Sequence, residues 1–254
     1  MSKIFVWSLV LIMAVFTSSA FALSLHPKTG EPLVVNCYRG TPTLDGVLNE
    51  WGGDVAVLDV VEQIADPPLW EGPADCSAKF YTMWDDTNIY VGVVVTDDAV
   101  VANQTGGDIW KNDCAEIFFA TTNSVEGHAE HYQYGITPTG SIWNWCNMDG
   151  NGSQEPGYVQ LATNETDSGY VMECAVEYSN MASLSFTAGD IIGYHPCVDD
   201  SDGADEEPAF QLSWTGMEAH DQTTGFGHLV LSSDVVTAVS ANGKLATTWA
   251  GIKR

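Results

Sequence analysis

The chain has 254 residues and carries 34 Asp and Glu against 8 Lys and Arg, which gives a formal net charge of −26 at pH 7. This balance argues against nucleic acid and anionic membrane surfaces as partners, because binding to either requires clustered Lys and Arg. The length fits one large β domain or two small ones, and the acidity favours solubility and the binding of cations.

The N-terminal residues predict export. Lys3 supplies a basic start, residues 4–16 form an apolar run, and residues 20–22 (Ala-Phe-Ala) form a small-residue cleavage site. The run is shorter than the roughly 18–20 residues that a helix needs to cross a membrane, and no other stretch reaches that length. We therefore expect a signal peptide at residues 1–22 and a secreted mature chain, periplasmic or extracellular, that begins at Leu23.

Short segments of alternating apolar and polar residues follow, separated by Gly, Pro, Asn and Asp. Without a long helical period, this pattern predicts an all-β fold, an antiparallel β-sandwich or jelly roll. We expect an N-terminal arm at residues 23–35, the sandwich at 36–232 and a C-terminal tail at 233–254. In chain order, the expected strands are residues 33–38, 55–61, 78–84, 89–96, 114–119, 131–137, 141–145, 159–162, 170–178, 191–198, 210–214 and 226–231, with one helical turn at 179–185.

Trp110 lies just before an expected strand, where a loop would place its ring at the rim of the sheet, and Glu116 lies in the middle of that strand. In an extended chain, Glu116 shares a face with Cys114 and Phe118. A charge is seldom buried unless it is paired or hydrogen-bonded, so this face is either solvated or receives a ligand. An indole such as Trp110 covers the C–H groups of a sugar, and a carboxylate accepts hydrogen bonds from its hydroxyls. An ordinary outward Glu and a core Trp are the structural alternative.

Four segments, in this order, resemble family-9 carbohydrate-binding modules: residues 41–51, 78–97, 110–119 and 226–229. The resemblance covers residues 36–232. It implies a β-sandwich that binds polysaccharides or oligosaccharides without catalysis, that accompanies glycoside hydrolases, and that holds structural calcium.

The resemblance also implies an aromatic sandwich with polar groups beneath it. Trp110 and Glu116 match one sandwich Trp and a hydroxyl-binding Glu, whereas the second sandwich position is His220 in this chain. An amide-bearing position of the family matches Cys197, and a basic position falls in the vicinity of Tyr134. We therefore predict that the carbohydrate-binding residues are Trp110, Glu116, His220 and Tyr134.

An acidic segment at residues 199–207 predicts a cation site. It is not an EF-hand, because Val198 and Ala209 would occupy the first and last ligand positions. Calcium is the hard cation that such oxygen-rich loops bind, and a solvated acidic loop is the alternative. The predicted calcium ligands are Asp200, Asp202 and Asp205.

The cysteines after residue 22 are even in number: Cys37, Cys76, Cys114, Cys146, Cys174 and Cys197. In an exported protein an even count suggests disulfides, while free buried cysteines in strands are the alternative. A disulfide between Cys114 and Cys197 would occupy part of the Glu116 face and would argue against sugar binding.

Three other functions remain open. A haem-binding electron-transfer sandwich would use His195, His220 or Met217 as axial ligands. A calcium-dependent structural or adhesive module would use the acidic loops and the tail. An enzyme has little support, since the sequence has no G-x-S-x-G, H-E-x-x-H, P-loop or Rossmann motif, and residues 128–131 (His-Ala-Glu-His) lack further zinc ligands at a useful spacing.

Overall fold

The computed structural model describes residues 24–58, 61–62, 69–122, 130–150, 152–203, 208, 210–217, 220 and 225–236. Its elements are β1 Val34–Arg39, β2 Val55–Leu58, β3 Val61–Glu62, β4 Cys76–Trp84, β5 Asn88–Asp97, η1 Gly106–Lys111, β6 Cys114–Thr121, β7 His131–Ile136, β8 Ile142–Cys146, β9 Val159–Thr166, β10 Gly169–Glu177, η2 Tyr178–Asn180, β11 Ile191–Asp200, β12 Phe210–Ser213 and β13 Gly227–Val235. The expected strands are present to within a few residues. The expected strand 55–61 is divided into β2 and β3, and the short 3-10 helix η1 was not predicted.

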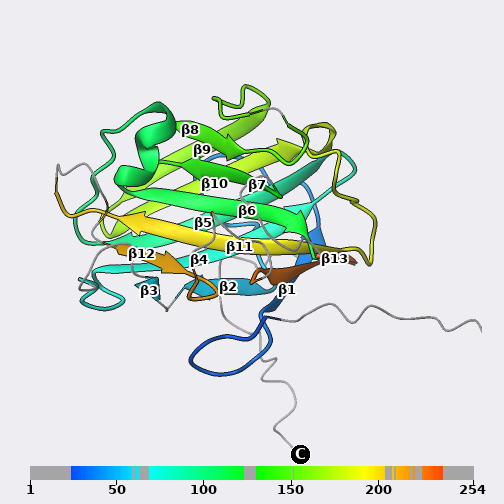
Figure 1. The fold of residues 1–254 in the computed structure, drawn as a ribbon, viewed down its shortest axis with the longest axis horizontal. Coiled ribbons are helices and arrows are strands. Elements are labelled where there is room, and N and C mark those ends of the chain that lie inside the picture. The colour runs from blue at the N-terminus through cyan, green and yellow to red at the C-terminus, as the bar shows by residue number, and fades with distance from the viewer. Residues whose placement is uncertain are drawn as a thin grey trace, which may run out of the picture.

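The strands form a two-layered β-sandwich (Figure 1). One layer, called the β6 layer here, has the strand order β8-β7-β6-β11-β13, and β12 pairs with β11. The other, called the β5 layer, has the order β4-β5-β10-β9, and β2 pairs with β4. Strand β1 lies between β13 and β4 and runs parallel to both, so the expected purely antiparallel sheet is in fact mixed. The fold class, a β-sandwich, is as predicted.

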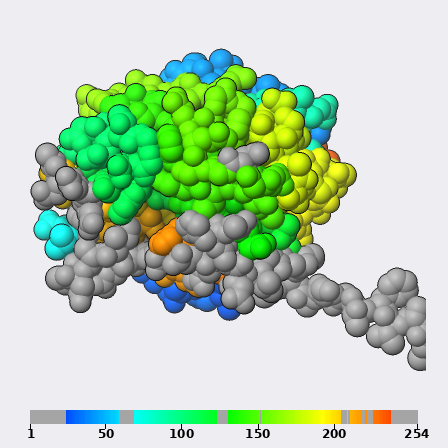
Figure 2. Space-filling view, turned by 45° about the horizontal axis from the view of Figure 1, so that its top comes forward, coloured from blue at the N-terminus to red at the C-terminus, as the bar shows by residue number. Residues whose placement is uncertain are grey.

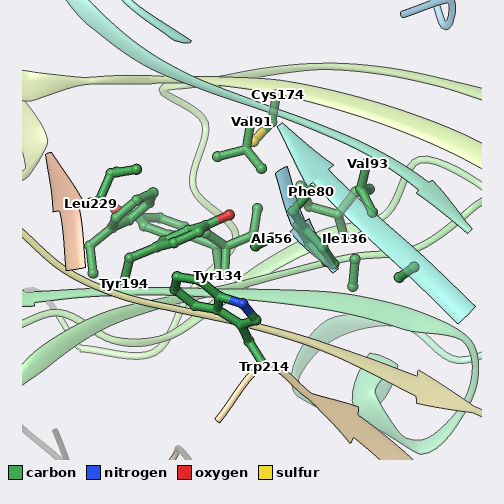
Figure 3. Packing of buried hydrophobic residues seen from close by; sticks show 14 of the residues in the cluster. Ala56, Phe80, Val91, Val93, Tyr134, Ile136, Cys174, Tyr194, Trp214 and Leu229 are labelled. Atoms are coloured by element: carbon green, nitrogen blue, oxygen red, sulfur yellow. The ribbon is translucent and has the colours of Figure 1, made fainter. Parts of the chain in front are cut away.

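The hydrophobic core fills the space between the two layers (Figure 3). Alternation along β6 sends Ile117 and Phe119 into the core, and both side chains are almost fully buried. Tyr194 of β11 stacks on Phe119, with ring centroids 5.7 Å apart. Phe80, Val91 and Val93 of the β5 layer belong to the same cluster. The side chains that alternate with the core residues therefore lie on the outer faces of the layers.

A long loop covers the outer face of the β5 layer. Trp51 is 5% exposed, and its Nε1 donates to Glu173 Oε1 over 2.8 Å. The backbone N–H groups of Asp45 and Gly46 donate to Glu173 Oε2 over 2.9 and 2.5 Å. Because this loop also packs on Gly92 of β5, that strand is buried on both faces, which explains its nearly continuous apolar sequence.

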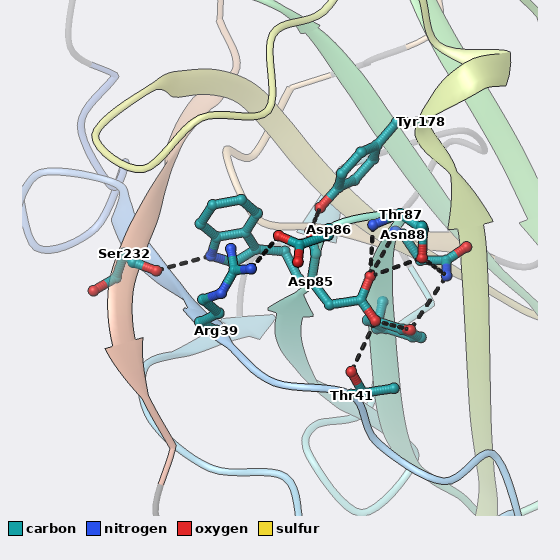
Figure 4. Close-up of polar contacts among 10 residues, drawn as sticks. Arg39, Thr41, Asp85, Asp86, Thr87, Asn88, Tyr178 and Ser232 are labelled. Carbon is teal, nitrogen blue, oxygen red and sulfur yellow. Dashed lines mark hydrogen bonds and ion pairs between the residues drawn. The ribbon is translucent and has the colours of Figure 1, made fainter.

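The turn between β4 and β5 is fixed by its own acidic residue (Figure 4). Asp85 Oδ1 accepts from the backbone N–H groups of Thr87 and Asn88 over 2.8 and 2.9 Å, and Asp85 Oδ2 accepts from Thr41 Oγ1 over 2.8 Å. Beside it, Arg39 pairs with Asp86. Burial acts to raise the pKa of Asp85, but hydrogen bonds from Tyr90, Thr87 and Asn88 outweigh it and lower that pKa. Both carboxylate oxygens of an acidic turn residue in this chain can thus accept hydrogen bonds from the protein itself.

The six cysteines are all described, all buried, and form no disulfide with one another, contrary to the expectation from their even number. Cys37 and Cys174 face the core, whereas Cys114 and Cys197 lie on the outer face of the β6 layer. They occupy strand positions as small apolar residues. Within the described residues, no helix has the length and apolar character needed to cross a membrane. The predicted signal peptide and the region from residue 237 onward lie outside the described residues.

Candidate functional site

The outer face of the β6 layer carries the polar side chains that alternate with the core. The register pairs Glu116 of β6 with Cys197 of β11 and with Gly135 of β7. One step along the strands, Phe118 pairs with His195 and with Gln133. The predicted parity of β6 is thus confirmed, because Glu116 and Phe118 share the face opposite the core.

Glu116 lies in a short row of hydrogen-bonded carboxyl and amide groups. It is only 5% exposed, and Gln133 Nε2 donates to its Oε2 over 2.7 Å. Its carboxyl group also hydrogen-bonds to that of Asp199, whose Oδ1 accepts from Gln211 Nε2 over 2.7 Å. Burial raises the pKa of Glu116, and the hydrogen bonds from Asp199 and Gln133 act in the opposite direction. The row therefore holds Glu116 in one orientation as a hydrogen-bond acceptor.

Trp110 belongs to the short helix η1, which ends three residues before β6 begins. Figure 1 shows η1 beside β8 and β7 at one end of the β6 layer. The indole is half-buried, and Lys111 Nζ lies 6.0 Å from its ring centroid. Lys111 also pairs with Asp108 over 3.1 Å within the helix. The predicted place of Trp110, at the rim of the sheet just before the strand, agrees with this arrangement.

Two further tryptophans, Trp143 and Trp145 of β8, were not singled out by the sequence. Trp145 Nε1 donates to the carbonyl of Gly107 in η1 over 2.9 Å, and Trp143 Nε1 donates to Ser153 Oγ over 2.7 Å. The ring of Trp145 occupies the place where a side chain at Gly135 would lie. Because Gly135 is the direct neighbour of Glu116 in the sheet, Trp145 connects the Glu116 face with the helix that carries Trp110.

Figure 2 shows that the segment from η1 to β8, in teal to green, forms a broad part of the molecular surface on this side. Half-buried Trp110, Trp143 and Trp145 all belong to that segment. In the register of β7 and β8 the residue opposite Gly135 is Trp143, so no pairing pattern in the sequence points to Trp145.

His220 and Tyr134 have different places. His220 is exposed, and its charge acts to lower the pKa of Glu116, so it lies within electrostatic reach of that carboxyl group. Tyr134 is 1% exposed and points into the core, where its hydroxyl oxygen lies 3.3 Å from that of Tyr158. The prediction that Tyr134 is part of the Glu116 face is therefore wrong. Strand parity sends Tyr134 inward and its neighbour Gln133 outward to Glu116.

The sequence profile described as Carbohydrate family 9 binding domain-like matches residues 44–234. The chain belongs to this family. It is 26% identical over 204 residues to the exoglucanase XynX of Acetivibrio thermocellus, an alignment that covers 78% of this chain and 17% of that protein. It is 24% identical over 188 residues to endo-1,4-beta-xylanase A of Thermotoga maritima, covering 72% of this chain and 16% of that enzyme. The chain thus spans about a sixth of the length of these curated relatives.

The fold agrees with the family. A solved family-9 carbohydrate-binding module from Caldicellulosiruptor kristjanssonii, in complex with cellotriose, superimposes with a TM-score of 0.61 at 17% sequence identity, and the match covers 81% of this chain and 97% of that one. A glucose complex of a family-9 module from the same organism gives a TM-score of 0.59 at 18% identity, covering 80% and 98% of the two chains.

The residues considered for haem do not form a pair of axial ligands in the structure. His195 is fully buried on the Glu116 face, and its ring stacks on Phe226 with centroids 5.3 Å apart. Burial, with a smaller effect of His131, lowers the pKa of His195 to about 3, so its ring is neutral. Met217 and His220 are exposed. His195 thus serves as part of the aromatic packing beneath the site.

The acidic cluster differs from the predicted one. Asp200 and Asp202 do lie together, but Asp75 joins them, and a second group consists of Asp97, Asp113 and Asp200. Within each group the ligand oxygens lie within 4.8 Å of one another. Asp205, the third predicted ligand, lies outside the described residues. Sequence reasoning missed residues 75, 97 and 113 because they are distant from the 199–207 loop along the chain.

The second group, called the acid cluster here, is buried. Asp97 is 6% exposed, Asp113 0% and Asp200 2%. Burial and the charge of Asp97 raise the pKa of Asp113 to about 9 and that of Asp200 to about 8. Asp97 Oδ2 and Asp200 Oδ2 are buried and have no hydrogen-bond partner among the described residues. A cation that takes oxygen ligands would satisfy both atoms, so the donor set fits calcium.

Proposed function

We propose that this chain is a secreted, non-catalytic carbohydrate-binding module in which Trp110 stacks on a sugar ring. Glu116 accepts hydrogen bonds from the sugar hydroxyls, and His220 forms the opposite wall. The observation that carries the proposal is Glu116 itself. It is a carboxylate in the middle of a strand that faces away from the core, is held by Gln133 over 2.7 Å, and lies in the layer against which the Trp110 helix packs.

Several features support a neutral, hydroxyl-rich ligand. The described residues of this face offer amide, carboxyl and aromatic groups, and the Lys111 and Asp108 side chains neutralise each other. Stacking of an indole and a hydrogen bond to a carboxylate contribute about 1–3 kcal/mol each, which leads us to expect millimolar to micromolar affinity. The relatives that carry similar domains are named as glucanases and xylanases, so glucan and xylan oligosaccharides are the first probes.

The test is a saccharide titration of the secreted chain, followed by Trp fluorescence and calorimetry, with cellotriose and xylotriose as probes. Trp110→Ala should weaken binding by about 1–3 kcal/mol while lowering the free energy of unfolding by less than about 1 kcal/mol, because a half-buried rim residue contributes little to the core. Trp70→Ala is the matched control, since Trp70 is also half-buried and also lies near a lysine, at 5.5 Å from Lys28 Nζ. Failure of the intact chain to bind any saccharide, or unfolding of Trp110→Ala, contradicts the proposal.

We also propose that the protein binds calcium through carboxylate oxygens of the acid cluster. The support is the pair of buried oxygens, Asp97 Oδ2 and Asp200 Oδ2, that have no donor among the described residues. Arg39, which pairs with Asp86, and Lys111, which pairs with Asp108, lie elsewhere. Calcium would supply positive charge at a site where carboxylates otherwise repel one another. The melting temperature should rise with calcium over chelator at matched ionic strength, and an equal rise with sodium would contradict a specific site.

A further inference from the structure

The acid cluster lies at the base of the loop that carries Trp110. This loop, called the Trp110 loop here, comprises residues 98–112 and joins β5 of one layer to β6 of the other. Asp97 is the last residue of β5, and Asp113 immediately precedes β6. Asp200 is the last residue of β11. The two ends of the loop and the end of a third strand therefore meet in one group of carboxylates.

The same carboxylates organise the backbone of the loop. Asp97 Oδ1 accepts from the N–H of Ala99 over 2.8 Å, and Asp113 Oδ2 accepts from the N–H of Val101 over 2.5 Å. The N–H of Asp113 donates back to the carbonyl of Val101 over 2.9 Å. Asp113 Oδ1 accepts from the N–H of Ser201 over 2.9 Å, which ties the loop to the segment after β11. The positions of the Asp97 and Asp113 carboxylates thus determine the path of the loop.

The loop also has anchors away from the acid cluster: Ile109 is 0% exposed, and Thr139 Oγ1 donates to the carbonyl of Ala102 over 3.4 Å. Asn103 N–H donates to Asn112 Oδ1 over 3.2 Å, and Gly107 accepts from Trp145 over 2.9 Å. No strand pairing stabilises residues 98–112, and η1 is a single short helix. The three buried carboxylates at the base therefore have a strong effect on the position of the loop. When ionised they repel one another, which would push the two ends of the loop and β11 apart.

Two carboxylate oxygens of the acid cluster have no hydrogen-bond partner among the described residues and could bind a cation. Asp97 Oδ2 belongs to the β5 layer and Asp200 Oδ2 to the β6 layer, and both side chains are more than nine-tenths buried. A single cation held by both would bridge the layers at the point where the Trp110 loop begins and ends. We infer that calcium in the acid cluster holds the Trp110 loop in place, so that calcium and saccharide bind cooperatively. The cooperative part of this inference rests on the proposed function.

The consequence is reciprocal. If calcium raises the affinity for a saccharide by some factor, the saccharide must raise the affinity for calcium by the same factor. Couplings of this kind commonly amount to about 5-fold or more, and we expect saccharide binding in EDTA to be at least about 5-fold weaker than in calcium.

The first test does not depend on any saccharide. Hydrogen exchange of the exported protein, measured in CaCl₂ and in EDTA at matched ionic strength, should show slower exchange of residues 98–112 in calcium. The internal control is the segment 41–51, which is anchored on Glu173 by Trp51 and two backbone N–H groups and should be indifferent to calcium. Unchanged exchange of the Trp110 loop while calcium is bound would overturn the inference.

Asp200→Asn keeps the shape of the side chain and removes its charge. It should abolish the effect of calcium on loop exchange and should bring saccharide affinity in calcium down to the value measured in EDTA. Asp167→Asn, at an exposed position in the turn between β9 and β10, is the matched control and should retain both effects. Retention of both effects in Asp200→Asn would overturn the inference.

The two proposals fail in different ways. If calcium slows hydrogen exchange in the Trp110 loop but no saccharide binds, the calcium site that holds the loop stands and the proposed carbohydrate function is wrong. If cellotriose or xylotriose binds equally well in calcium and in EDTA, carbohydrate binding stands and the coupling is overturned. Titration with calcium alone, followed by calorimetry, shows whether the chain binds calcium at all. A chain that binds no calcium would also overturn the inference.

Discussion

Each layer of the sandwich buries a glutamate in the middle of a strand, on the face away from the core, yet the two are used differently. Glu173 of the β5 layer is fully buried and receives three hydrogen bonds, one from Trp51 and two from backbone N–H groups. Glu116 of the β6 layer is 5% exposed and receives a hydrogen bond from Gln133, while its other close partner, Asp199, is itself an acid.

The difference teaches that burial alone does not distinguish a structural carboxylate from a functional one. What distinguishes them is the balance of donors and acceptors around each group. Around Glu173 the loop supplies donors to both oxygens, so the carboxylate anchors that loop. On the β6 side, Glu116 contacts a second acid, Asp199, and in the acid cluster Asp97 Oδ2 and Asp200 Oδ2 have no hydrogen-bond partner among the described residues. An external ligand or cation can therefore complete the second region but not the first.

Trp51→Ala should give the largest effect on the structural side of this comparison. The change removes a buried aromatic side chain and the Nε1 donor to Glu173, so we expect the free energy of unfolding to fall by about 3–5 kcal/mol. Urea denaturation measures it. Similar losses for Trp51→Ala and Trp110→Ala would mean that the two regions are not different in kind.

Replacing each glutamate by glutamine compares the two groups directly. Glu173→Gln turns one acceptor oxygen into a donor that faces existing donors, which should cost about 1–3 kcal/mol of stability. Glu116→Gln relieves a contact between two acids, so its stability should change by less than about 1 kcal/mol, while saccharide binding weakens by less than in Trp110→Ala. A large loss of stability in Glu116→Gln would show that Glu116 is structural as well.

Gly135→Ala tests whether Trp145 supports the Glu116 face. A Cβ at this position would lie 2.3 Å from the Trp145 ring and 3.0 Å from Cys114 Sγ, so the ring must move, at a cost of about 1–3 kcal/mol. The control is Gly157→Ala, where nothing lies within 4 Å of the new Cβ and no loss is expected. Binding that survives Gly135→Ala unchanged would separate Trp145 from the proposed site.

The pH dependence of stability should reveal the acid cluster. Burial raises the pKa of Asp113 to about 9 and that of Asp200 to about 8, above the ordinary value of 3.8, so between these limits the folded chain binds more protons than the unfolded chain. Stability in EDTA should therefore fall as the pH rises from about 4 through 8 to 9. A fall of about 1 kcal/mol corresponds to about 2–4 °C in melting temperature for a chain of this size.

Calcium should suppress that fall, because the bound cation favours the ionised carboxylates. Thermal unfolding at pH 5, 7 and 9 in CaCl₂ and in EDTA measures the difference, and Asp167→Asn serves as the control for a general change in charge. Parallel curves in the two solutions would show that the acid cluster does not bind calcium.

Alternation along single strands made much of the β6 layer predictable. The segment 114–119 was expected to be a strand with Glu116 outward and Ile117 inward, and both orientations are as expected. Trp110 was expected at the rim, and it lies in η1. Tyr134 was predicted wrongly because the resemblance gave only a neighbourhood, and an error of one residue in a strand moves a side chain to the opposite face.

The sequence by itself determined the local features of this protein: its strands, its turns, the acidity that favours cations, and the side of β6 on which Glu116 lies. These follow from short-range rules, because a strand alternates its side chains with a period of two whatever it packs against. Only the tertiary structure decided which distant groups meet. Glu173 accepts hydrogen bonds from a loop that lies more than a hundred residues away along the chain. Asp97, Asp113 and Asp200 lie close together at the ends of three strands. Such meetings depend on the register and stacking of the layers, which no local pattern encodes.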